Sequence, residues 1–364
     1  TRSLCDWSSD VCSSDLTKVI TVIEAADLAQ LQEAGAIIRR GGLVAFPTET
    51  VYGLGGNALD PEVATKIYAA KGRPSDNPLI VHVARPEEVE ALVTRVPAVA
   101  EKLIERFWPG PLTLVFAAAE QVPRRTTGGL DTVAIRLPAH PVALALIEVG
   151  GCPLAGPSAN LSGCPSPTTA QHVIADLAGR VDMIIDSGRT GVGVESTVLD
   201  VTVSPPQILR PGGLTLEQLQ QVIPAVTVDP TVVQDTPPEG GRVRSPGMKY
   251  KHYAPKAEVV VVEGRPTAIV TKICSLYDDY VSQGKRVAIM ATTETAHLYG
   301  QRQTSIVGAR EDLATVAANL FDLLRWFDAQ GTEVILAEGV DMVGLGLAVM
   351  NRLRKAAGYR IVKA

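Results

Sequence analysis

Two stretches decide the fold: LVAFPTETVYGLGGNA at residues 43–58 and KGRPSDNPLIVH at residues 71–82. The apolar runs LVAF and LIVH are typical of buried strands, and loops rich in Thr, Pro and Gly adjoin them. Polar side chains at the ends of strands mark the usual site of an open α/β sheet. We therefore predict an α/β fold whose functional site lies at the edge of the sheet.

Strand-like and helix-like segments alternate outward from this centre, as α/β layers require. In the first part, helices are predicted at 26–40, 61–70, 86–93, 97–107, 141–149, 169–178 and 215–223. A Pro- and Gly-rich linker is predicted at 224–256, and helices follow at 267–283, 294–300, 311–329 and 345–357. With 364 residues, the chain is expected to form two domains, at 17–223 and 257–364.

Composition excludes several classes of protein. Apolar residues make up 46% of the chain, which excludes general disorder, and the net charge of −5 disfavours a globally basic nucleic-acid binder. Aromatic residues make up only 4%, too few to form the rows of rings on which bases stack in proteins that bind single-stranded nucleic acid. No apolar run reaches the ~18 residues of a membrane span, so we expect a soluble protein. The five cysteines form no C-x-x-C pair, and such a scattered, odd set suits a reducing cytoplasm.

The first 16 residues, TRSLCDWSSDVCSSDL, differ from the rest of the chain. They lack the basic start and apolar centre of a secretory signal. They also resemble translated sequencing-adapter read-through, so we interpret them as a foreign, disordered leader.

Four cations sit where a site is expected. Lys71 and Arg73 lie in the turn K-G-R-P that follows a helix. The compact ammonium group of a lysine beside the planar guanidinium of an arginine suits the binding of a polyphosphate. Arg136 in TVAIRLP and Arg210 in ILRPG lie on apolar strands, where an arginine is rarely buried without an anion. The sequence therefore predicts an anion-binding cleft in an acidic domain.

Structural explanations exist for each of these residues taken singly. Thr48 and Thr50 fit as caps, Asn77 as a turn former before Pro78, and His82 as a satisfied core histidine. Lys71 and Arg73 could equally be a solvated charge pair. The concentration of so many polar groups within 35 residues favours a site over these separate explanations.

The sequence does not match several well-known catalytic and nucleotide-binding motifs. GPSAN at 156–160 has Asn160 where the nucleophile elbow G-x-S-x-G needs glycine, so Ser158 is not predicted to be a hydrolase nucleophile. GLGGNA at 53–58 matches a dinucleotide fingerprint only loosely, because no acid follows at the required distance. The P-loop and H-E-x-x-H signatures are absent from the sequence.

Six segments in register, PTETVYGLG, KGRPSDNPLIVH, TVAIRLP, PSANLSGCPSPT, GVESTVLD and ILRPG, resemble the threonylcarbamoyl-AMP synthase (YrdC-like) family over about residues 17–219. The remainder, entered by SPGMKYKHYAPK, resembles the longer two-domain members. The resemblance implies a twisted mixed sheet with helices and a large concave cleft, a linker or lid, and a smaller C-terminal α/β Rossmann-like domain.

The resemblance also implies a nucleotidyltransferase reaction. L-threonine, bicarbonate and ATP, with Mg²⁺, would give threonylcarbamoyl-AMP and pyrophosphate in the cytoplasm. A partner complex would then transfer the group to tRNA, forming threonylcarbamoyladenosine. No metal ligands are predicted, and direct contact with RNA is left open.

The family pattern places residues in two groups. Lys71 and Arg73 are the catalytic candidates. Near L-threonine the pattern puts Thr50, His82, Arg136 and Ser196. Near ATP it puts Lys71, Arg73, Asn77, Thr132, Ser158, Asn160, Ser166, Arg210, Tyr250, His252 and Tyr253. Gly156-Pro157 departs from many relatives, which puts one substrate contact there in question.

Two alternative functions are compared with this one. A basic cleft also suits a non-catalytic RNA-binding module. A carbamoyl-transfer module of hydrogenase maturation is disfavoured, because the cysteine-rich zinc motifs of that protein are missing here. The segment GLGLAVMNRLRKA at 344–356 is interpreted as a packing helix, not as a cofactor site.

Overall fold

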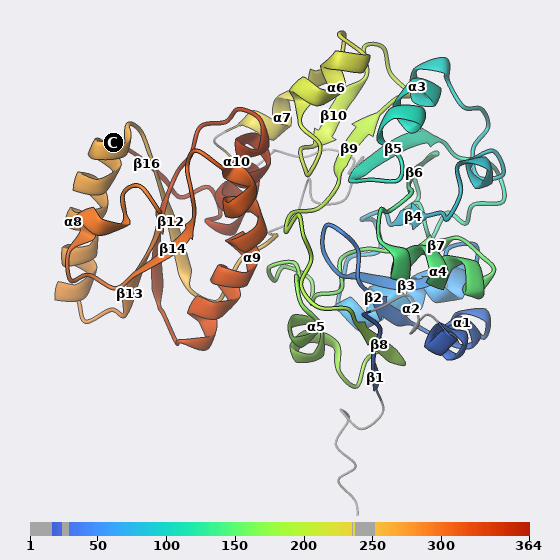
Figure 1. The fold of residues 1–364 in the computed structure, drawn as a ribbon, viewed down its shortest axis with the longest axis horizontal. Helices are drawn as coiled ribbons and strands as arrows, with labels where there is room; N and C mark the ends of the chain where they lie inside the picture. Colours follow the sequence, from blue (N-terminus) through green and yellow to red (C-terminus); the bar gives the residue numbers. More distant parts are fainter. Residues whose placement is uncertain (1–16, 24–28, 235, 237–251) are drawn as a thin grey trace, which may run out of the picture.

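The computed structural model describes residues 17–23, 29–234, 236 and 252–364, so the expected leader at 1–16 and Tyr250 lie outside the described residues. Two units are visible, each built around its own sheet, and they lie side by side (Figure 1). The predicted fold class is confirmed: both units are layers of helices on sheets.

The N-terminal unit holds a mixed sheet of eleven described strands in the order β1-β8-β2-β3-β7-β4-β6-β5-β9-β10-β11. Its apolar side chains form cores on both faces of the sheet. The strands are β1 (Lys18–Thr21), β2 (Val44–Phe46), β3 (Gly53–Asn57), β4 (Ile80–His82), β5 (Leu112–Ala117), β6 (Thr132–Arg136), β7 (Leu154–Ala155), β8 (Met183–Asp186), β9 (Thr197–Asp200), β10 (Gln207–Arg210) and β11 (Thr227–Val228).

Glycines in β3 allow the strand to pack closely against the aromatic ring of Phe46. A Cβ on Gly53 or Gly55 would come within 3.0 Å of the Phe46 ring of the neighbouring strand β2. The run GLGG is therefore packing against an aromatic ring inside a strand, which agrees with rejecting it as a dinucleotide loop.

Helices cover this sheet, and most match their predicted positions. They are α1 (Leu31–Arg39), α2 (Pro61–Lys71), η3 (Pro86–Val89), α3 (Ala98–Phe107), α4 (Pro141–Gly150), α5 (Ala170–Leu177), α6 (Leu216–Val222) and α7 (Pro230–Val233). The helix predicted at 86–93 is only the short 3-10 helix η3. The start predicted for the first helix, at residues 26–28, lies outside the described residues.

The predicted linker begins with regular structure. β11 pairs in parallel with β10, and Asp229 caps the short helix α7 through its side chain. β11 was not predicted from the sequence, because an edge strand of two residues is too short to show an alternating pattern of apolar and polar residues.

The C-terminal unit has a parallel sheet of five described strands in the order β14-β13-β15-β12-β16. Its strands are β12 (Glu258–Glu263), β13 (Val287–Thr292), β14 (Thr304–Gly308), β15 (Val334–Glu338) and β16 (Ile361–Lys363). Its helices are α8 (Pro266–Ser282), η4 (Ala296–Tyr299), α9 (Leu313–Ala329) and α10 (Leu345–Ala356). β16 was not predicted, and the helix expected at 294–300 is the short 3-10 helix η4.

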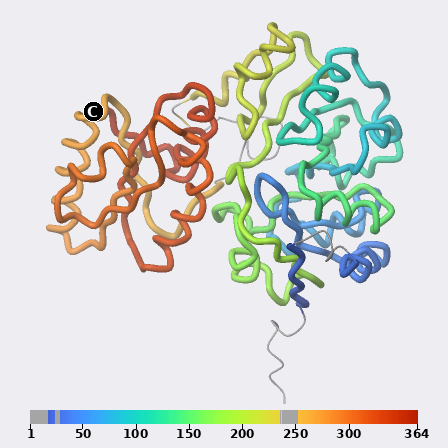
Figure 2. Tube along the Cα trace, in the orientation of Figure 1, coloured from blue at the N-terminus to red at the C-terminus, as the bar shows by residue number. Residues whose placement is uncertain are grey.

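Helices α9 and α10 lie between the C-terminal sheet and the N-terminal unit, as the tube in Figure 2 shows. The core on this side of the C-terminal sheet includes Val51 and Val194 from the N-terminal unit, and also Tyr253. The two units therefore share one apolar cluster. None of the helices in the described part of the chain is long and apolar enough to span a bilayer.

Candidate active site

A hollow in the N-terminal unit gathers most of the predicted site residues. Eleven of them line it: Lys71, Arg73, His82, Arg136, Ser158, Asn160, Ser166, Ser196, Arg210, His252 and Tyr253. The convergence of the four cations on one concavity is confirmed. These side chains come from strands, loops and a helix end that are far apart in the sequence.

Strand pairing explains this convergence. β4 and β6 run parallel and place His82 opposite Arg136, so both side chains emerge at the same edge of the sheet. β9 runs parallel to β5 and antiparallel to β10, which brings the start of β9 beside Arg210. Residues that end neighbouring strands thus meet around one space.

Arg136 is buried among polar groups. Its Nη1 donates to Thr50 Oγ1 at 2.9 Å, its Nε donates to Gly110 O at 3.3 Å, and its Nη2 lies 2.6 Å from Glu49 Oε1. Thr50 is fully buried and also lies 2.8 Å from Thr48 Oγ1. Thr50 therefore does not line the hollow but supports the arginine from behind.

Lys71 and Arg73 lie at the end of α2, where Gly72 takes a left-handed conformation (φ 60°) that turns the chain toward the hollow. Lys71 Nζ donates to the carbonyl oxygens of Ser158 and Asn160, the latter at 2.6 Å. Burial, and then the charge of Arg73, holds the pKa of Lys71 well below its usual value. A cation in this position gains from an anionic ligand.

Arg73 also rests on neutral groups. Its guanidinium donates to Asn77 O at 3.3 Å and to Pro78 O at 2.9 Å. Burial lowers its pKa to about 10. Neither contact supplies a counter-charge.

Ser158 and Asn160 face one another on the loop after β7. The Ser158 hydroxyl donates to Asn160 Oδ1 at 2.6 Å, and Asn160 Nδ2 donates to Leu161 O and Cys164 O. The acceptor for the hydroxyl is an amide oxygen and not a base, which agrees with rejecting Ser158 as a hydrolase nucleophile.

His82 is buried and neutral. Burial, followed by the charge of Arg136, lowers its pKa to about 3. A Cβ on Gly156 would lie 2.6 Å from His82 Nδ1, so the glycine makes room for this ring. Nδ1 finds no hydrogen-bond partner in the structure described and is therefore open to a substrate donor.

Ser196 and Arg210 form the opposite wall. Arg210 donates to Ser196 O at 2.9 Å and to Ser196 Oγ at 3.2 Å, and Thr113 Oγ1 lies 2.7 Å from Ser196 Oγ. Burial lowers the pKa of Arg210. The hydroxyl and the guanidinium are thus fixed side by side.

Glu195 is a lining residue that the sequence reasoning missed. It accepts a hydrogen bond from Ser166 Oγ at 2.5 Å and one from Arg352 Nε at 2.9 Å. The nearby arginines, Arg352 first, hold its pKa at about 2 despite burial. Its place in the quoted segment GVESTVLD, beside Ser196, was the available signal.

His252 and Tyr253 bring the chain back over the hollow after the undescribed segment. Ala254 N donates to Gly163 O at 2.9 Å, which ties this stretch to the loop that carries Asn160. The Tyr253 ring stacks on Phe321 at 5.3 Å, and the Arg352 guanidinium lies over the same ring at 5.4 Å. Burial lowers the pKa of His252 to about 3.

Two other predicted residues do not line the hollow. Asn77 is buried behind Arg73, and its backbone oxygen accepts from that arginine. Thr132 begins β6, at the opposite end of the strand from Arg136, and pairs with Ala117. A direct ATP contact of Thr132 therefore stays a prediction that this hollow does not support.

The electrostatics of the hollow follow from these contacts. Four cations line it, while Glu195 is the one carboxylate among its described lining residues. Arg136 is paired with Glu49, and Arg210 lies near Glu195, whereas Lys71 and Arg73 donate to neutral carbonyl groups. Buried positive charge with neutral partners is unfavourable unless an anion completes the site. The fold and the hollow define an α/β protein with a cationic pocket for a small anionic ligand.

Comparisons with known proteins identify the family. The model described as telomere recombination matches residues 36–212, and the model described as threonylcarbamoyl-AMP synthase, C-terminal domain, matches residues 214–358. The chain is 51% identical over 348 residues to the threonylcarbamoyl-AMP synthase of Pyrococcus abyssi, covering 96% of this chain and 100% of that protein. For the threonylcarbamoyl-AMP synthase of Bacillus subtilis the identity is 49% over 335 residues, covering 92% and 94%. The chain belongs to the threonylcarbamoyl-AMP synthase family.

A solved structure agrees across both units. The crystal structure of P. abyssi Sua5 complexed with L-threonine superposes with a TM-score of 0.90 at 51% identity, covering 96% of this chain and 100% of that one. The family and the two-unit fold predicted from the sequence are therefore confirmed.

Proposed function

We propose that this protein is an L-threonylcarbamoyladenylate synthase, which converts L-threonine, bicarbonate and ATP into threonylcarbamoyl-AMP and pyrophosphate. The observation that carries the proposal is the convergence of Lys71, Arg73, Arg136 and Arg210 on one hollow. The ligands of this reaction carry two carboxylates and a triphosphate, which is the load that such a set of cations can neutralise.

The chemistry needs positioning more than an activated side chain. The neutral threonine amine forms an N–C bond with the carbon of bicarbonate, and water is lost, which gives an N-carboxylate. An oxygen of that carboxylate attacks the α-phosphorus of ATP, and the bond between the α- and β-phosphates breaks to release pyrophosphate. The substrate is itself the nucleophile, so orientation and charge neutralisation suffice. The interaction of Ser158 with an amide fits this scheme.

Roles follow from the position of each cation. Lys71 and Arg73, at the end of α2, hold the phosphates, and Arg210 supports the adenylate side. Arg136 binds the threonine carboxylate, with Thr50 orienting its guanidinium. His82 and Ser196 complete the threonine side.

The remaining predicted residues surround the nucleotide. Ser158, Asn160 and Ser166 offer neutral hydrogen-bonding groups to ATP, and Asn77 acts through Arg73. His252 and Tyr253 cover the pocket, and by excluding water they would protect the hydrolysable adenylate.

Magnesium is proposed to enter as part of the substrate. Among the described residues, no group of three or more His, Cys, Asp or Glu side chains could hold a metal ion. Glu195 is engaged by Ser166 and Arg352. The residues present do not fit a resident metal site, so Mg²⁺ would arrive bound to the phosphates of ATP.

The cellular setting is proposed from the same chemistry. ATP and tRNA point to the cytoplasm, and the cysteines of the described chain, Cys152, Cys164 and Cys274, are free thiols. The product would pass to a separate complex that modifies tRNA.

Pyrophosphate release tests the proposal. The protein is incubated with Mg·ATP and bicarbonate, with and without L-threonine, and release is expected only when threonine is present. L-Threonine-independent release, or none at all, would contradict it. In parallel, the melting temperature should rise cooperatively with ATP and threonine, whereas a rise with RNA alone would favour the non-catalytic RNA-binding module.

A further inference from the structure

The loop at residues 158–166 carries three of the predicted ATP residues, Ser158, Asn160 and Ser166. Within the N-terminal unit, Lys71 Nζ donates to the carbonyl oxygens of Ser158 and Asn160, and Ser162 N donates to Lys71 O at 2.8 Å. The C-terminal unit adds contacts to these. Side chains from helices α9 and α10 of the C-terminal unit contact it directly or through one intermediate residue.

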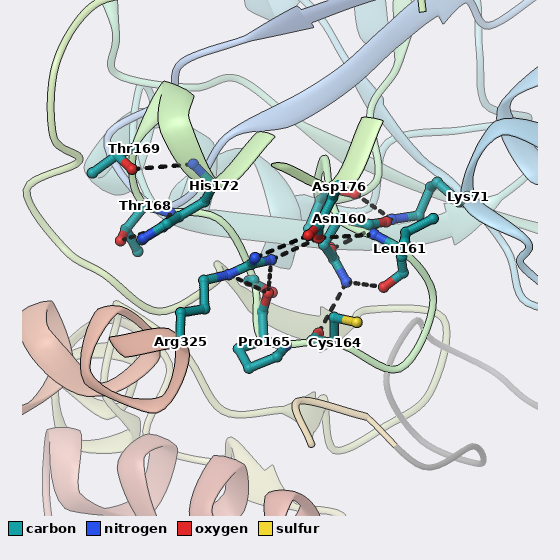
Figure 3. Close-up of polar contacts among 12 residues, drawn as sticks. Lys71, Asn160, Leu161, Cys164, Pro165, Thr168, Thr169, His172, Asp176 and Arg325 are labelled. Carbon is teal, nitrogen blue, oxygen red and sulfur yellow. Dashed lines mark hydrogen bonds and ion pairs between the residues drawn. The ribbon is translucent and has the colours of Figure 1, made fainter. Parts of the chain in front are cut away.

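Arg325 of α9 makes the first connection (Figure 3). Its Nη2 donates to Pro165 O at 2.6 Å, and its guanidinium forms a fork with Asp176, with Nη1 to Oδ1 at 3.0 Å and Nη2 to Oδ2 at 2.7 Å. The two side chains are only 13% and 10% exposed. A partly buried, bidentate pair of this kind fixes orientation as well as distance.

Asp176 passes this contact to the middle of the loop. Its Oδ2 accepts from Leu161 N at 3.1 Å, directly after Asn160 (Figure 3). Asn160 in turn accepts from Lys71 Nζ through its backbone oxygen at 2.6 Å. A short chain of contacts thus runs from Arg325 to a catalytic candidate.

Arg352 of α10 makes the second connection, at Ser166, the last residue of the loop. It is fully buried, and its Nε donates to Glu195 Oε2 at 2.9 Å, while Nη1 donates to Pro211 O at 2.7 Å. Glu195 Oε1 accepts from Ser166 Oγ at 2.5 Å. Ser166 is therefore held through a carboxylate whose counter-charge comes from the C-terminal unit.

We propose that Arg325 and Arg352 are positioning residues that hold loop 158–166 in its ATP-binding shape, which makes the C-terminal unit a structural part of the adenylating pocket. The proposal rests on the proposed function and extends it to a domain for which the sequence suggested only packing. Neither arginine lines the hollow, so each acts through other residues.

The expected effect falls on ATP and not on threonine. The residues assigned to threonine, Thr50, His82, Arg136 and Ser196, lie outside the loop. Loss of either arginine leaves a buried carboxylate without its partner and frees the loop to shift, and a misplacement of ~1 Å can cost ~10²-fold in rate.

The test uses the full chain with Arg325→Met and Arg352→Met. We expect the KM for ATP to rise ~10-fold or more, consistent with loss of a charged hydrogen bond. Binding of L-threonine alone, measured by calorimetry, should stay within about twofold of wild type. Arg189→Met is the matched control, because Arg189 crosses the same interface to Asp322 and Asn319 without touching the loop. Its KM for ATP should be unchanged.

Conservative variants separate positioning from general stability. Arg325→Lys keeps the charge but cannot form the fork, so its KM should lie between those of wild type and Arg325→Met. Unchanged KM for ATP in both Met variants would overturn the proposal. Equal weakening of ATP and threonine, in step with a lower melting temperature, would also overturn it. If Arg352→Met does not fold, the Arg325 series decides alone.

The proposed function can fail independently of this inference. If the wild-type protein bound a non-hydrolysable ATP analogue but released no pyrophosphate from ATP in the presence of threonine, the proposed synthase activity would be contradicted. The same analogue still reports whether the two arginines shape the ATP site.

Discussion

The two units treat buried charge in opposite ways. In the N-terminal hollow, Lys71 is buried and Arg73 is half-buried, and both donate to neutral carbonyl groups. In the C-terminal unit, Glu338 ends strand β15 at 4% exposure, and donors surround it. Both sites lie where strands or helices end, so topology alone does not tell them apart.

The two sites differ in whether the buried charged group has partners of opposite charge or enough hydrogen-bond donors. Glu338 accepts from the backbone and hydroxyl of Thr292, from Thr295 at 2.5 Å, from Tyr299 at 2.6 Å, and from Arg310 at 3.3 Å. Burial, and then the hydrogen bond to Glu338, raises the pKa of Tyr299. A carboxylate so fully paired has a structural role, whereas a cation with only neutral partners is ready for a ligand.

The largest effect is expected for Arg73→Ala. Removing one electrostatic donor from the pocket should slow pyrophosphate release ~10²- to 10³-fold. Arg124→Ala removes an exposed cation of the same unit, paired with Asp131, and should leave the rate near wild type. An Arg73→Ala protein that kept the wild-type rate would remove the basis of the comparison.

A smaller effect, on folding and not on catalysis, is expected for Glu338→Gln. The amide keeps one acceptor but loses the charge and brings an extra donor into a site already full of donors. We expect unfolding free energy, measured in urea, to fall by about 1–3 kcal/mol. The KM for ATP should not change at 25 °C. A raised KM with unaltered stability would mean that Glu338 belongs to the functional site.

The smallest effect concerns pH and His82. As pH falls, the unfolded chain takes up this proton near the ordinary pKa of ~6.5, whereas the folded protein resists until about 3, so stability present above pH 6.5 is lost on acidification. Between pH 6.5 and 5.5, wild type should lose about 1 kcal/mol more than His82→Asn. His252 carries a similar shift but is common to both proteins. Parallel stability curves for the two proteins would contradict a neutral, buried His82.

Much of this site could be predicted from the sequence, because its motifs stand at the ends of strongly apolar strands. Arg136 and Arg210 were found because an arginine inside TVAIRLP or ILRPG has no apolar explanation. The order of the strands was not predicted. β1 pairs with β8, although more than 160 residues separate Lys18 from Met183 along the chain, and no local pattern encodes that pairing.

The contribution of the C-terminal unit could not be predicted either. Arg352 stands in a helix with apolar residues on most sides, and its partner Glu195 is 157 positions away. A buried arginine on a packing helix looks like a surface residue until the tertiary structure places an acid opposite it. Thr50 and Asn77 were predicted to bind threonine and ATP, but neither lines the hollow, and only the fold shows that they contact Arg136 and Arg73.

The ion pair of Arg352 with Glu195 also bears on how such a protein can be divided. A fragment ending near residue 234 would keep Glu195 and Arg210 in the interior and discard Arg352, which contributes most to balancing the carboxylate. Such a fragment would be expected to take up a proton at Glu195 or to open its interior to water. Engineering a minimal, single-domain version of this protein would therefore have to supply Glu195 with a new partner or replace it with a neutral side chain.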